Sequence, residues 1–132
     1  MKKLLAIVVL GLLMSSSVNA EWLKFTEIKQ NGMKVFIDLE TFKKDKNFRY
    51  IWMMTDLKSP IKDNTIDFDI YSSKEYLKID CQTMKTGKLQ YIFYSGQMGE
   101  GKHFPFQRKN LKWLYYPPKS WAHNLVVSLC KY

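Results

Sequence analysis

The sequence predicts an α+β domain, in which an antiparallel sheet of about six strands has a C-terminal helix packed on it. Two observations predict the sheet. Apolar and polar residues alternate in several stretches between Trp22 and Tyr116, and these stretches are rich in aromatic and β-branched side chains. A third observation predicts the helix, because apolar residues recur at three- and four-residue spacing after Lys119.

The first three strands are predicted from alternation and turn residues. Trp22–Lys29 and Met33–Asp38 flank Asn31-Gly32, a dipeptide that favours the positive backbone angles of a tight hairpin. The basic segment Lys43–Asn47 is predicted to be a turn. It leads into Phe48–Thr55, which we expect to be a central strand because four large apolar side chains alternate along one of its faces.

A meander of three further strands is predicted next. Lys58–Asn64 contains a proline and alternating charges, which indicates an exposed loop. Strand character returns in Asp67–Ser72 and in Glu75–Gln82. Thr86-Gly87 is predicted to turn the chain into a strand over Lys88–Tyr94.

The last part of the chain changes character twice. The glycine-rich segment Met98–Gly101 lacks the spacing of a phosphate-binding loop and is predicted to be flexible. A strand over Phe106–Tyr116 ends at Pro117-Pro118, after which Ser120 can cap a helix. The apolar face of that helix is Trp121, Ala122, Leu125, Val126, Leu129 and Cys130. Four aromatic residues are predicted to pack between sheet and helix: Trp52, Phe93, Trp113 and Trp121.

The N-terminus is typical of a cleavable secretory signal peptide, which we assign to residues 1–20. Lys2 and Lys3 precede an apolar stretch of 11 residues, and Val18-Asn19-Ala20 suits signal peptidase. The apolar stretch is too short to span a bilayer, and Glu21 stands where a bacterial lipoprotein would have its lipid-bearing cysteine. We therefore expect one exported domain, residues 21–132, located in the periplasm, on the cell surface or outside the cell.

Cys81 and Cys130 are the only cysteines, and export would place them in an oxidising compartment, so we predict a disulfide between them. Closing a loop of about 50 residues would stabilise the fold by roughly 3 to 5 kcal/mol. The sequence has no C-x-x-C motif, and the cysteines and the two histidines, His103 and His123, lack the spacing of a zinc site. We predict no metal and no cofactor.

A set of short segments, in this order and with this cysteine spacing, resembles the bacterial surface-adhesin protein E family. These segments are Trp22, Val35-Phe36-Ile37-Asp38, Tyr50-Ile51-Trp52, Ser72-Ser73-Lys74, Ile79-Asp80-Cys81, Met98-Gly99-Glu100-Gly101, Trp113, Pro118-Lys119-Ser120 and Cys130-Lys131. The resemblance implies an antiparallel sheet with a disulfide-tethered C-terminal helix. It also implies attachment to host extracellular-matrix or plasma proteins such as laminin, vitronectin and plasminogen.

Basic residues are the candidate binding groups. The whole chain has a net charge of +9 at pH 7, and basic residues gather in two clusters. The first cluster is Lys43, Lys44, Lys46 and Arg49, and the second is Arg108, Lys109 and Lys112, which Lys119 could join. One interpretation is solvated charge that keeps a sheet protein soluble. The other is a patch for an anionic partner, such as a heparin-like glycan, an acidic protein region or a lipid head group. Export argues against nucleic acid.

Catalysis has little support in the sequence. Neither histidine sits in a recognisable motif, and no G-x-S-x-G occurs. The aspartates could form a carboxylate pair only if folding brought them together: Asp38, Asp56, Asp67, Asp69 and Asp80. We therefore predict a non-enzymatic binding protein. The alternative is a soluble periplasmic accessory protein with no dedicated ligand, and either is compatible with a homodimer.

Overall fold

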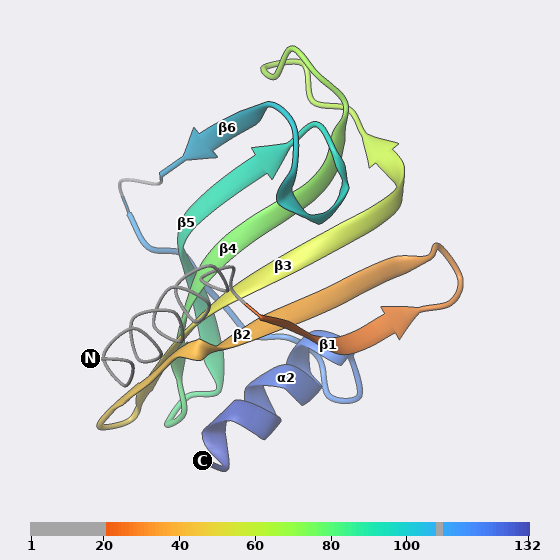
Figure 1. The fold of residues 1–132 in the computed structure, drawn as a ribbon. Coiled ribbons are helices and arrows are strands. Elements are labelled where there is room, and N and C mark those ends of the chain that lie inside the picture. The colour runs from red at the N-terminus through yellow and green to blue at the C-terminus, as the bar shows by residue number, and fades with distance from the viewer. Residues whose placement is uncertain (1–20, 108–109) are drawn as a thin grey trace, which may run out of the picture.

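Apart from the last short strand, each strand pairs antiparallel with its neighbours in the chain, as the alternating sequence predicts. The computed structural model describes residues 21–107 and 110–132, so the predicted signal peptide lies outside the described residues. The elements are β1 (Trp22–Ile28), β2 (Met33–Asp45), β3 (Phe48–Ile61), β4 (Ile70–Asp80), β5 (Lys85–Tyr94), the 3-10 turn η1 (Gln97–Gly99), β6 (His103–Phe106), β7 (Trp113–Leu114) and the helix α2 (Trp121–Cys130). The sheet order is β1-β2-β3-β4-β5-β6, with β7 also paired to β5 (Figure 1). The predicted α+β fold is confirmed.

The β1–β2 hairpin turns where the sequence predicts it. Gly32 has a φ of 72°, and the Asn31 side chain accepts a hydrogen bond from the Met33 N–H at 3.0 Å. A side chain that satisfies the backbone within the turn fixes where the hairpin reverses.

Strand β2 is longer than predicted, because a bulge interrupts the alternation without ending the strand. Its register with β3 shifts between Asp38 and Lys43, and the Thr41 hydroxyl bridges the gap by accepting from the Trp52 N–H at 3.1 Å. The prediction of a turn over Lys43–Asn47 is therefore wrong at its start. The two lysines at 43 and 44 belong to β2, and the strands reverse at residues 46 and 47.

Two further segments were assigned to the wrong structure in the sequence-based prediction. Strand β3 runs on to Ile61 rather than giving way to a loop at Lys58, and its proline lies where the β3–β4 register shifts, so it costs no ladder bond. The predicted strands Asp67–Ser72 and Glu75–Gln82 merge into one strand, β4, which begins only at Ile70 and ends at Asp80. Its Ser72 and Ser73 pair with both neighbouring strands, so these polar residues do not break it.

Gly87 lies inside β5 and does not form the predicted turn. The chain reverses at residues 81–84, where Met84 has a φ of 60°. A Cβ at Gly87 would lie 2.6 Å from the Leu111 Cδ1, so the glycine makes room for a side chain that crosses the strand. The missing side chain serves packing rather than chain reversal.

The predicted strand Phe106–Tyr116 does not form as one strand: it overlaps only the last residue of β6 and the two residues of β7. β6 pairs with Tyr91–Tyr94 at one end of β5, and β7 pairs with Thr86–Gly87 at the other end. β6 and β7 therefore lie at opposite ends of β5.

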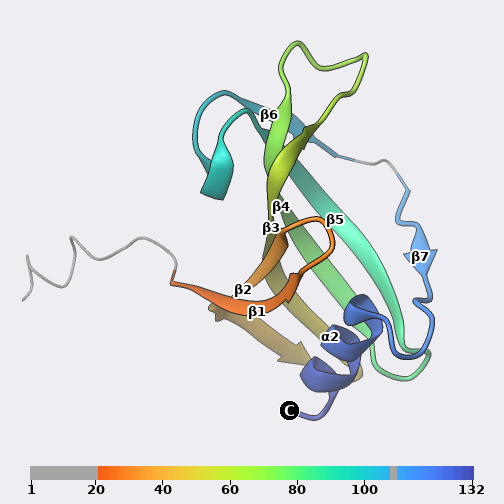
Figure 2. The ribbon, with the colours of Figure 1, turned by 90° about the vertical axis from the view of Figure 1, so that its right-hand side faces the viewer.

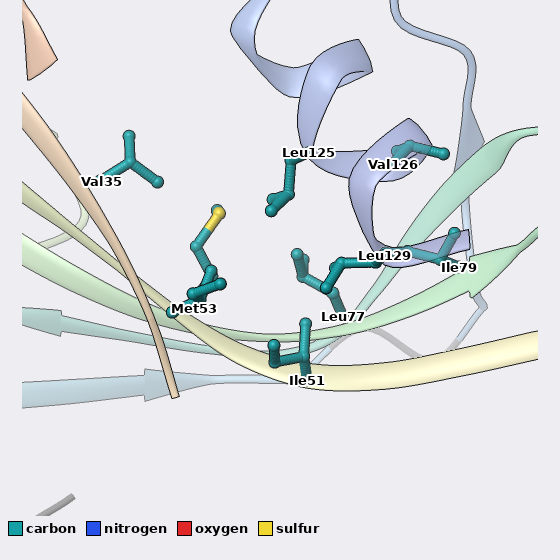
Figure 3. Close-up of a cluster of buried hydrophobic side chains, with 9 residues drawn as sticks. Val35, Ile51, Met53, Leu77, Ile79, Leu125, Val126 and Leu129 are labelled. Carbon is teal, nitrogen blue, oxygen red and sulfur yellow. The ribbon is translucent and has the colours of Figure 1, made fainter. Parts of the chain in front are cut away.

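The hydrophobic core lies between the sheet and α2 (Figure 3). Its buried members are Val35, Ile37, Ile51, Met53, Leu77, Ile79, Leu125, Val126 and Leu129. Ser120 caps the helix as predicted and accepts from the His123 N–H at 3.2 Å. The Cys81–Cys130 disulfide is present, with a Cα–Cα distance of 5.6 Å, and it fastens the end of α2 to the end of β4.

Of the four aromatic residues predicted to pack against the helix, only Trp121 contacts the core. Trp52 lies on the opposite face of β3, Trp113 is 36% exposed, and Phe93 lines a hollow that α2 does not line. Both faces of β3 carry apolar side chains, so alternation alone could not show which face meets the helix.

Replacing Cys81 with serine is expected to lower the free energy of unfolding by roughly 3 to 5 kcal/mol, because the unfolded chain regains the entropy of a 49-residue loop. Thermal denaturation measures the loss, and a thiol reagent should detect a free Cys130. A Cys81→Ser/Cys130→Ser variant is the control for the stray thiol. A melting temperature equal to that of the oxidised protein would contradict this prediction.

Candidate binding surface

The face of the sheet opposite α2 carries large rings and lysines, because residues of even number on β3 and β4 point away from the helix. Figure 2 shows α2 against one side of the sheet only. We call the opposite side the lysine–aromatic face. Its rings are Trp22, Phe48, Tyr50, Trp52, Tyr76, Tyr94 and Trp113, and its lysines are Lys43, Lys74 and Lys78.

Strand register places the rings in rows. Trp52 and Tyr76 are directly paired on β3 and β4, and their ring centroids are 5.1 Å apart. Tyr76 also stacks on Tyr50 at 6.2 Å, and Phe48 stacks on Trp113 at 6.5 Å. Cross-strand aromatic pairs of this kind stabilise a sheet and remain available as flat contact surfaces.

The lysines lie over these rings. The Lys78 Nζ is 4.4 Å from the Phe48 ring centroid and 5.7 Å from that of Tyr50, and the Lys74 Nζ is 5.1 Å from the Tyr94 ring centroid. Such cation–π contacts hold the aliphatic stems on the rings. Within the described residues, none of the three lysines of this face has a carboxylate partner within 4.0 Å. Their charge is thus available to an anionic partner.

The first predicted basic cluster divides between the surface and the interior. Lys43, Lys44 and Lys46 are exposed at the end of the β2–β3 hairpin. Arg49 is 5% exposed, and its guanidinium donates to the carbonyl oxygens of Lys46 at 2.9 Å and Tyr132 at 3.0 Å. Arg49 therefore joins this hairpin to the end of the chain that follows α2.

Part of the second cluster lies outside the described residues, namely Arg108 and Lys109. Lys112 is exposed and directly precedes Trp113. Trp113 stacks on Phe48, the first residue of β3, so Lys112 lies near the β2–β3 hairpin that carries the first cluster. Lys119 is exposed ahead of α2, with a φ of 71°.

Lys74, Lys78 and Tyr76 were not predicted as site residues. Their alternation along β4 was visible in the sequence, but it equally fits a solvated strand face. The register between β3 and β4 supplies the missing information, because it sets each of them beside a ring or a lysine of β3.

The segment predicted as a flexible loop is tied to this face. The buried Ser72 hydroxyl donates to the Gly96 carbonyl at 2.6 Å and accepts from the Gly99 N–H at 2.9 Å. Asp56 accepts from the Met98 N–H at 2.8 Å. Gly99 has a φ of +73°, and a Cβ there would lie 2.7 Å from the Lys74 Cε. The η1 segment therefore packs closely against one lysine of the face.

Aromatic rings and unpaired lysines lie side by side on this surface, which makes it a candidate for contact with an anionic partner. The described residues contain no cluster of three metal-ligating side chains, and none of their helices is long and apolar enough to cross a bilayer. Two of the aspartates considered for a carboxylate pair, Asp38 and Asp56, are buried and accept hydrogen bonds from backbone N–H groups. Rings supply flat contact area, and lysines supply attraction that salt would screen.

Comparison with known proteins agrees with this architecture. A family model described as "Surface-adhesin protein E" matches residues 22–131. A structure of Haemophilus influenzae protein E aligns with a TM-score of 0.62 and 15% identity over 87% of both chains. A second crystal form aligns with a TM-score of 0.64 and 15% identity over 87% of this chain and 91% of that one. These structures establish the likeness of fold, and no curated protein matches the sequence.

Ser72→Ala is expected to destabilise the protein by about 1–3 kcal/mol, because it leaves the Gly96 carbonyl and the Gly99 N–H without their partner. Amide hydrogen exchange at Met98 and Gly99 should accelerate. Ser128→Ala, which removes a hydroxyl bonded within α2, is the matched control and should change stability much less. Unaltered exchange in Ser72→Ala would show that other contacts hold the segment.

Proposed function

The chain belongs to the surface-adhesin protein E family, and from that premise we propose that it is an exported, non-enzymatic adhesin for host extracellular-matrix or plasma proteins. The observation that carries the proposal is the family match, which spans nearly all of the described chain. The lysine–aromatic face is the surface we assign to binding.

Physical chemistry supports this choice of surface. Lys74 and Lys78 lie over aromatic rings, and the exposed hairpin with Lys43, Lys44 and Lys46 lies at one end of the face. Because rings hold the lysine stems in place, these side chains have little conformational freedom to lose on binding. Acidic regions of laminin, vitronectin or plasminogen, and heparin-like glycans, have the complementary charge. The aromatic rings of this face would add apolar contact area to the attraction between opposite charges.

A second candidate is a periplasmic accessory protein without a dedicated ligand. The observation that favours it is Glu21 at the position that follows the predicted cleavage site, where a lipidated surface protein would have cysteine. In that case the lysines would act as solvated surface charge.

Replacing Lys74 and Lys78 with glutamine is expected to weaken binding to the preferred partner by roughly fivefold to thirtyfold, as lost cation contacts at a partly exposed surface imply. Surface plasmon resonance against laminin, vitronectin, plasminogen and heparin would measure it, at about 0.15 M and about 1 M salt. A second variant neutralises Lys43, Lys44 and Lys46. The matched control neutralises Lys29 and Lys62, which are exposed and outside this face. Equal loss in the control would refute the assignment of the face.

Protease added to intact cells is expected to remove the protein, because an adhesin must be accessible from outside. An immunoblot of the cells, with a periplasmic enzyme as the protected control, reports the outcome. If the protein survives until the outer membrane is permeabilised, the periplasmic accessory role is the correct one.

A further inference from the structure

A cavity of about 230 Å³ lies on the helix side of the sheet, between the first turns of α2 and strands β3, β4 and β5. Its walls are mostly apolar and include Leu77, Ala122, Leu125 and Val126. An apolar cavity of about 150 Å³ in a protein interior is large enough for benzene. The space therefore suits a molecule that contains one ring.

Two buried polar atoms in the wall have no hydrogen-bond partner. They are the Glu75 Oε2 and the Thr86 Oγ1, on residues that are 9% and 3% exposed. Thr86 pairs with Ile79, which lies four residues along β4 from Glu75. At the rise per residue of a β-strand, the positions of the two oxygens along the sheet differ by about 13 Å. Two residues of the cavity wall thus carry an unpaired side-chain oxygen, and buried polar atoms normally find partners.

The electrostatics at the Glu75 end favour a positively charged guest. Lys88 contacts only the Oε1 of Glu75, at 3.4 Å. Burial raises the pKa of Glu75 despite this contact, so Lys88 alone does not compensate the buried carboxylate. Burial lowers the pKa of Lys88, but its interactions with Glu75, Tyr116 and Tyr91 together outweigh burial, so the pKa of Lys88 is raised. A second cation at Oε2 would stabilise the ionised carboxylate.

The Glu75 end of the cavity borders a second hollow. Glu75 and Lys88 also line this neighbouring hollow, whose aromatic walls include Phe93, Phe104 and Phe106. Phe104 and Phe106 are 36% and 46% exposed. The Glu75–Lys88 pair therefore lies between the cavity beneath α2 and a partly exposed aromatic surface.

We propose that this cavity is a binding site for a small primary amine with a ring-sized apolar body. Its ammonium group donates to the Glu75 Oε2, and its body lies between Leu77 of β4 and Leu125 of α2. The site is on the opposite side of the sheet from the lysine–aromatic face, so the proposal does not depend on the proposed adhesin function.

The probe is 2-phenylethylamine, titrated into the purified, oxidised protein at pH 7.5 and followed by the amide NMR signals of Thr86, Leu125 and Val126. We expect saturable shifts, with affinity at least about tenfold higher than for 2-phenylethanol, because a charged hydrogen bond exceeds a neutral one by about that factor. Phenylacetate, an anion with the same ring, should bind more weakly than either.

Two variants test the recognition group and the space separately. Glu75→Gln should lower the affinity for the amine by about tenfold and leave that for the alcohol nearly unchanged. Glu27→Gln makes the same substitution on an exposed part of β1 and is the matched control. Ala122→Leu fills the cavity and should abolish binding of all three probes without lowering the melting temperature.

Three results would overturn the proposal. They are no saturable shift at these amides, equal affinity for amine, alcohol and acid, or an undiminished affinity for the amine in Glu75→Gln. The first would identify a cavity filled by water, which also satisfies buried polar atoms. The other two would identify an apolar void that accepts small rings without selecting an amine.

Discussion

The packing of α2 on the centre of the sheet, fastened by the Cys81–Cys130 disulfide, is the constraint on which the rest of the structure depends. A helix of 10 residues is about 15 Å long, whereas β3 has 14 residues and extends for about 46 Å. One short helix therefore covers part of one face. The remaining surface of the sheet has to be compatible with water by other means.

Two features of the structure make this uncovered surface compatible with water. On the face opposite α2, lysines lie over the rings, so that aliphatic stems cover apolar surface while the charges stay in water. On the helix side, beyond the first turn of α2, the charged pair Glu75 and Lys88 separates the core from an aromatic hollow. Both solutions leave chemically distinctive groups: the lysine–aromatic face on one side of the sheet, and the Glu75–Lys88 pair beside the cavity beneath α2 on the other.

Features set by local chemistry could be predicted from the sequence. These include the Asn31-Gly32 hairpin, the Ser120 cap, the cysteine pair and the strand periodicity. The strand limits could not, because bulges at residues 39–42 and after Asp56 interrupt alternation while pairing continues. The turn assigned to Gly87 failed for a different reason, since only tertiary contact with Leu111 explains that glycine.

The candidate sites were less accessible to sequence reasoning than the fold. Exposed lysines at 43, 44 and 46 are adjacent in the chain and form an obvious cluster. Lys74 and Lys78 join them only through strand register, and Glu75 acquires significance only because α2 closes a cavity beside it. The match to the surface-adhesin protein E family gives a class of function and does not choose among these residues.

The bracing of β5 by two short partners has a consequence for self-association. β6 occupies one end of β5 and β7 the other, so neither end can accept a strand from a neighbouring molecule. At the far margin of the sheet, the pairing of β1 is interrupted between Lys24 and Thr26, and the Lys24–Glu27 ion pair adds charge there. Irregular, charged or very short margins discourage amyloid-like stacking. The margins of the sheet therefore disfavour the addition of a strand from another molecule, while its face keeps a broad ring-lined surface.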